Sequence, residues 1–113
     1  MAISASMIVS TTFTVEGRSV REVKGLVRGI VVRSPTIAQG LLGGLKGILG
    51  GNIEAYTEMC EQARAGAFDR MIEHARQVGA NAVLGVRYDA SEVGGARTAA
   101  TEVLCYGTAV VLA

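Results

Sequence analysis

One long stretch of helical spacing constrains this chain more than any other feature. From Ile53 to Val78, small or apolar residues recur every three or four positions, and charged residues occupy most of the positions between them. This spacing predicts a single amphipathic helix with one buried stripe. The stripe consists of Tyr56, Met59, Cys60, Ala63, Ala67, Met71, Ala75 and Val78. Asn52 suits the N-cap, and Gly79 can adopt the left-handed conformation that ends many helices.

Four segments of extended character flank this helix. Ile8–Phe13 is a short β-branched run that predicts a strand, and Glu16–Arg18 after it reads as a turn. Longer strands are predicted over Val20–Arg33, Ala82–Val93 and Thr98–Leu112.

The faces of these strands differ in character. In the 20–33 strand, the apolar face contains two glycines, which we expect to let the long helix approach closely: Val23, Gly25, Val27, Gly29 and Val31. In the 82–93 strand, alternation places these residues on one face: Ala82, Leu84, Val86 and Tyr88. The 98–112 strand is apolar on both faces, which indicates burial on both sides and a central place in the sheet.

The glycine-rich segment after Pro35 predicts a second, short helix. Apolar residues recur at helical spacing over Thr36–Leu49. In a separate part of the chain, Gly94–Gly95 marks a tight turn. A phosphate-binding loop is excluded in the glycine-rich segment, because Leu45 stands where that pattern needs Gly and Gly47 where it needs Ser or Thr.

The order of elements is strand, strand, short helix, long helix, strand, strand. Placing the last strand between the 20–33 and 82–93 strands gives a split β-α-β sheet with the long helix on one face. This is an α+β, two-layer domain. The other face of the sheet must then meet the short helix, another subunit, or both.

Length and composition narrow the function classes. The 113 residues suffice for a single domain over 1–113, in which we expect 1–6 to be a loose N-terminal extension. Half of the residues are hydrophobic, yet no Trp is present, so an apolar excess remains that an oligomer would cover. The net charge of +1 without a basic stripe argues against nucleic acid, and the apolar runs are too short to span a membrane. We expect a cytoplasmic protein.

Several stretches resemble one bacterial and archaeal family. They are Ile8-VSTTFTVEGR, Gly29-IVV, Gly50-GN-IEAY, Gly79-ANAVLGVRYD and Gly107-TAVVL. The resemblance is to the YbjQ family, also called the putative heavy-metal-binding domain, and it covers nearly the whole chain from Met7. It implies a dodecin-like β-α-β-β subunit with a short extra strand and helix, assembled as a ring-shaped pentamer, with no established activity. The segment Gly40-LLGGLKGIL departs from the aromatic, charged segment that family members usually carry.

We expect no cofactor, and a soft metal ion is the only one that these residues suggest. The candidate ligands are Cys60, Cys105, His74 and the four methionines, although no Cys or His motif of metal-site spacing is present. Cys60 and His74 lie fourteen residues apart on one helix, about 21 Å, so they cannot share an ion within one subunit. The alternative for both cysteines is burial as small hydrophobic side chains. For His74, the alternative is a surface or half-buried place near the helix end.

Three functions from different classes remain open. The first is a homo-oligomeric binding or scaffold protein without catalytic residues. The second is a soft-metal binder that uses its cysteines. The third is a small-ligand or enzyme site in a pocket between subunits, where we would expect Tyr88, Arg87 or Glu102.

Overall fold

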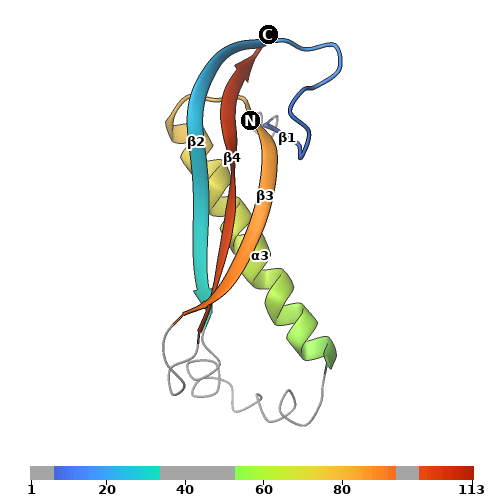
Figure 1. Cartoon of the computed structure of the whole chain (residues 1–113), viewed down its shortest axis with the longest axis vertical. Helices are drawn as coiled ribbons and strands as arrows, with labels where there is room; N and C mark the ends of the chain where they lie inside the picture. Colours follow the sequence, from blue (N-terminus) through green and yellow to red (C-terminus); the bar gives the residue numbers. More distant parts are fainter. Residues whose placement is uncertain (1–6, 34–52, 94–99) are drawn as a thin grey trace.

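The structure is a computed structural model that describes residues 7–33, 53–93 and 100–113 (Figure 1). Four predicted features lie outside these residues: the short helix over 36–49, the turn at 94–95, the N-cap residue Asn52 and the extension over 1–6. The described ranges contain five elements: β1 (Ile8–Val9), β2 (Val20–Arg33), α3 (Ile53–Gln77), β3 (Ala82–Val93) and β4 (Ala100–Leu112).

The strands form one mixed sheet in the order β1-β3-β4-β2. The central strand β4 pairs antiparallel with both β2 and β3, and β1 adds a short parallel pair to β3. The helix α3 runs diagonally behind the three long strands (Figure 1). The predicted α+β, two-layer architecture and the central position of the last strand are therefore confirmed. No helix in the described ranges has the length and hydropathy needed to cross a bilayer.

The buried stripe of α3 is built from small residues. Ala63, Ala67, Met71 and Ala75 are at most 3% exposed and belong to the main core between helix and sheet. At Gly79, with φ of 83°, the helix ends in the hydrogen bonds of a Schellman motif: Gly79 N–H donates to Arg76 O, and Ala80 N–H donates to Ala75 O. The predicted helix and its glycine end are confirmed.

The helix lies directly against the backbone of β2 at Gly29. A Cβ added to Gly29 would lie 2.5 Å from the Met71 backbone nitrogen and closer still to the Ala67 carbonyl oxygen. The predicted close approach is confirmed at this residue. It is wrong for Gly25, where an added Cβ would meet no atom within 4 Å. Gly25 instead has a φ of 114° next to a register shift, which is the conformation of a β-bulge.

A second bulge reverses the predicted faces of β3. Gly85 has a φ of 63°, and the pairing with β4 shifts between Leu84 and Arg87. As a result Val83 and Val86 both belong to the helix-side core, whereas Ala82 and Leu84 pack on the opposite side of the sheet. The predicted common face of Ala82, Leu84, Val86 and Tyr88 is wrong because the inserted residue breaks the two-residue alternation.

The N-terminal segment covers part of the face opposite the helix. The first strand is shorter than predicted and ends at Val9. Beyond it the backbone still bonds to β3, as in the donation from Gly85 N–H to Thr12 O. Ile8 and Val15 pack on the second core cluster, which contains Ala82, Leu84, Val110 and Leu112. The rest of this face, which we call the open face, consists of alternate residues of the three long strands: Leu26, Arg28, Ile30, Val32, Arg87, Asp89, Ser91, Glu102, Leu104, Tyr106 and Thr108.

We expect Gly29→Ala to lower the free energy of unfolding by roughly 1–3 kcal/mol, because the new methyl group meets backbone atoms that cannot rotate away. Gly66→Ala is the matched control. Its Cβ meets only a Val31 methyl group at 3.2 Å, and Ala gains about 1 kcal/mol of helix propensity over Gly. Urea denaturation monitored by circular dichroism measures both changes. A Gly29→Ala midpoint at or above the wild-type value would contradict the close packing.

Candidate functional site

The buried thiol of Cys105 lies against a second sulfur atom. Cys105 and Met71 are both 0% exposed, and Cys105 Sγ lies 3.6 Å from Met71 Sδ. Cys105 comes from the central strand and Met71 from the middle of α3, so the contact joins the two layers at their tightest point. Burial as a small hydrophobic side chain is confirmed for Cys105.

Tyr88 pairs with Cys105 across β3 and β4, and hydrogen bonding between the two side chains affects the pKa of both. Burial raises the pKa of the Cys105 thiol above its ordinary value of 9.0, and the hydrogen bond with Tyr88 opposes that rise. The pKa of Tyr88 is also raised, first by burial and then by the neighbouring Cys105. The Arg64 guanidinium, 5.4 Å from the centre of the Tyr88 ring, acts in the opposite direction. At neutral pH the thiol is therefore protonated.

Cys60 does not share the environment of Cys105. Its side chain is exposed, so the expected burial is wrong for this cysteine. Cys60 precedes Met71 by eleven residues on α3, which is about 16 Å along the helix axis. The two thiols are therefore held apart within one chain.

His74 caps the edge of the sheet. Its Nδ1 accepts a hydrogen bond of 3.2 Å from the backbone N–H of Arg28, and Arg70 Nη1 donates to Ile30 O at 2.9 Å. The Arg28 N–H and the Ile30 carbonyl both belong to β2. This is an edge strand, with backbone groups that need hydrogen-bond partners. His74 is half-buried, and this hydrogen bond occupies its Nδ1.

Cys60, Cys105 and His74 are thus found in three different settings. Across the described ranges, no three His, Cys, Asp or Glu side chains lie together in a way that could hold a metal ion. The soft donors that the fold does bring together are Cys105 and Met71, a thiol and a thioether. Such a pair suits a soft monovalent ion better than zinc, which takes four ligands.

The residues proposed for a pocket between subunits are distributed over both faces. Arg87 donates to Thr11 O at 3.0 Å and lies over the Phe13 ring, which ties it to the N-terminal segment. Glu102 is half-buried and pairs across the strands with Ser91 on the open face. Tyr88 faces the helix instead, as its contacts with Arg64 and Cys105 show.

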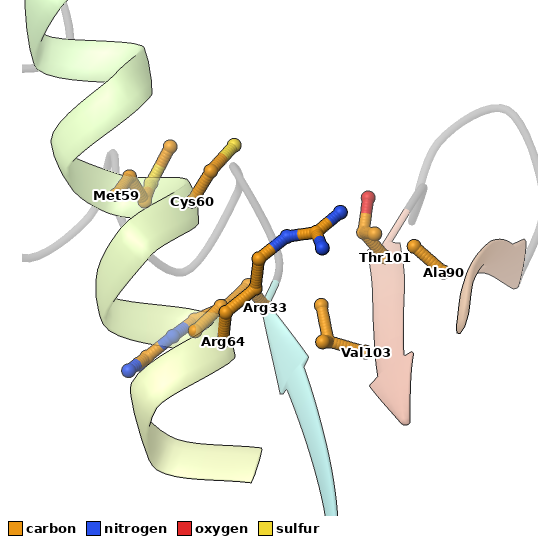
Figure 2. Close-up of a pocket in the computed structure, with 8 residues that line it drawn as sticks. Arg33, Met59, Cys60, Arg64, Ala90, Thr101 and Val103 are labelled. Carbon is orange, nitrogen blue, oxygen red and sulfur yellow. The ribbon is translucent and has the colours of Figure 1, made fainter. Parts of the chain in front are cut away.

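A cavity of about 150 Å³ lies between the first half of α3 and the neighbouring ends of the strands. Figure 2 shows Met59 and Cys60 on the helix wall and Thr101 and Val103 on the β4 wall. Two arginines, Arg33 and Arg64, also line this cavity. Sequence patterns did not reveal it, because its lining comes from four elements and no spacing rule connects them.

The raised pKa of Cys105 predicts a loss of stability at alkaline pH. The unfolded thiol ionises near its ordinary value of 9.0, below the value in the folded chain. Its stabilising contribution is present below pH 9.0 and declines as the pH rises from there toward the folded value. We expect Cys105→Ala to show a smaller decline in the free energy of unfolding between about pH 8 and 9.5.

Urea titrations at a series of pH values measure this slope. Cys60→Ala, which removes the exposed thiol, is the control and should keep the wild-type slope. An unchanged slope in Cys105→Ala would show that burial of this thiol does not carry the effect.

Comparisons with known proteins place the chain in a family. The YbjQ family model, described as "Putative heavy-metal-binding", matches residues 7–113. A UPF0145 protein of Legionella pneumophila is 56% identical over 107 residues, which cover 95% of this chain and 99% of the relative. A UPF0145 protein of Francisella tularensis is 54% identical over 106 residues, with 94% and 99% covered.

One solved structure has the same fold. It is a protein of unknown function from Pediococcus pentosaceus, assigned to the DUF74 family, with a TM-score of 0.64 and 18% identity. The match covers 95% of this chain and 98% of that one. The family description names metal binding and no catalysed reaction. With a family model over nearly its whole length and relatives above 50% identity, this chain belongs to the uncharacterised UPF0145 (YbjQ) family.

Proposed function

We propose that this protein is a homo-oligomeric binding or scaffold protein of the cytoplasm, assembled as a ring of five copies and without catalytic activity. The observation that carries the proposal is the apolar character of the open face of the sheet. The ring size follows the family resemblance, and the free thiols of Cys60 and Cys105 suit a reducing compartment.

The open face exposes large apolar side chains along β2. Leu26 is 63% exposed and Val32 is 57% exposed, although their neighbours across the sheet belong to the central strand. Ile30 pairs with Leu104 between them, and both are half-buried. Exposed apolar side chains gathered on one face are typical of a surface that another protein covers.

The charges around these apolar side chains suit a second copy of the same chain. Arg28 lies on the β2 border of the open face, and Asp89 lies on the β3 border. In a ring, the β2 border of one copy can meet the β3 border of the next, because ring contacts join two different surfaces. Arg28 of one copy would then lie near an acidic side chain of its neighbour. This arrangement of charges favours a second copy of the chain over a partner protein whose surface carries charges of one sign only.

We expect native mass spectrometry of the purified protein to show a pentamer. Leu26→Lys and Val32→Lys each place an ammonium group in the proposed contact, so the concentration at which half of the chains are assembled should rise at least about tenfold. Gln77→Lys, at the exposed last residue of α3, is the control and should leave assembly unchanged. A monomeric wild-type protein, or folded Leu26→Lys and Val32→Lys variants that remain pentameric, would contradict the proposal.

Soft-metal binding is the second candidate, and the contact between Cys105 and Met71 favours it. Two sulfur donors 3.6 Å apart form part of a site for a soft monovalent ion. The thiol must lose its proton to bind, whereas burial raises its pKa, so uptake would strengthen with rising pH. Because of this cost, metal binding ranks second to assembly as a proposed function.

A titration with silver(I), followed by native mass spectrometry, tests this candidate. One ion per chain is expected in the wild-type protein and in Cys60→Ser. Cys105→Ser should lose it, and Met71→Leu should weaken it. Uptake that disappears in Cys60→Ser, or that persists in Cys105→Ser, would assign the metal to the exposed thiol instead.

A further inference from the structure

We propose that the cavity between α3 and the strand ends binds a small carboxylate with an apolar body of about the size of a benzene ring. The cavity lies within one chain, away from the open face, so this inference does not depend on assembly. Its lining residues are Arg33, Met59, Cys60, Ala63, Arg64, Ala90, Thr101 and Val103.

The size of the cavity sets the size of the ligand. Its volume is about 150 Å³, and an apolar protein cavity of that volume can hold one benzene molecule. This volume is too small to enclose a nucleotide. A single ring, or a short branched aliphatic group, would occupy it.

The walls suit an apolar ring. Ala63 and Val103 line the cavity and are at most 6% exposed. Met59 lies on the helix wall (Figure 2). The Met59 thioether is polarisable and flexible, so it can adapt to a flat ring and make favourable sulfur–aromatic contacts. These residues would contact the apolar body of the ligand, and its charged end would lie at the rim of the cavity.

The charges of the lining select an anion. Arg33 and Arg64 are among the described lining residues, and no described lining residue is Asp or Glu. The Arg64 guanidinium, which lies over the Tyr88 ring, is directed toward Thr101 and supplies the positive charge, whereas the Arg33 side chain runs away from the cavity (Figure 2). Within the described ranges, neither guanidinium takes part in an ion pair; the ion pairs there are Lys24–Glu22 and Arg76–Glu73. A guanidinium presents paired N–H donors that match the two oxygens of a carboxylate. The Thr101 hydroxyl supplies one more donor on the β4 wall.

Benzoate is the probe that fits this description, and toluene is its uncharged counterpart. Cys60 provides a readout inside the cavity, since its exposed thiol is also one of the lining residues. We expect benzoate to bind with a Kd on the order of 1 mM and to slow the alkylation of Cys60 by iodoacetamide in a saturable way. Toluene should bind at least about tenfold more weakly, because it cannot pair with Arg64.

Variants separate the two parts of the proposed site. Arg64→Gln should raise the benzoate Kd about tenfold or more. Ala90→Leu, at an exposed position on β3, fills the cavity while keeping Arg64 and should abolish binding. Arg21→Gln removes an exposed arginine outside the lining and should leave the Kd unchanged.

Ligand-observed NMR gives the Kd values, and circular dichroism confirms that each variant is folded. Absence of benzoate binding to the folded wild-type protein at 10-fold the expected Kd, about 10 mM, would overturn the proposal. So would benzoate binding that survives both Ala90→Leu and Arg64→Gln. Equal affinity for toluene and benzoate would overturn the assignment of a carboxylate.

Discussion

The contact between α3 and the backbone of β2 at Gly29 is the constraint on which the rest of the structure depends. Because Gly29 has no side chain, the carbonyl of Ala67 and the amide of Met71 lie against the strand itself. This distance is possible only with small residues on the buried stripe, which explains a core of Ala and Val without Trp. The same closeness brings Arg70 and His74 within hydrogen-bonding distance of β2, where they occupy backbone groups of an edge strand. A helix that stood further away would leave that edge open to pairing with other chains.

The two faces of the sheet have consequently different roles. On the helix side, close packing encloses Cys105 against Met71 and removes the thiol from solvent. Toward the first half of α3, where exposed Cys60 replaces the alanines of the stripe, the packing leaves a cavity with two arginines on its lining. On the other side, the N-terminal segment covers only one end of the sheet through Ile8 and Val15. Leu26 and Val32 remain exposed there, and this surface is the one that we assign to assembly.

Much of the fold could be predicted because local spacing and long-range packing agree. The strands β2 and β3 have the predicted bounds, and α3 ends one residue before the predicted Val78. Two-sided apolar character placed β4 in the centre of the sheet. The errors occur at Gly25 and Gly85, where bulges add a residue and reverse the alternation. A glycine in a strand permits either a close neighbour or a positive φ, and the pattern alone does not distinguish these uses.

The sequence by itself determined the elements, their order and the small-residue stripe, because these depend on periodicity and on residues near in the chain. Only the tertiary structure decided which side chains meet. It paired Cys105 with Met71 rather than with Cys60, and it placed His74 on the edge of β2. It also gathered Arg33 and Arg64 around one cavity from segments thirty-one residues apart. The diagonal crossing of the helix over the sheet sets these contacts, and no periodic pattern in the sequence encodes the direction of that crossing.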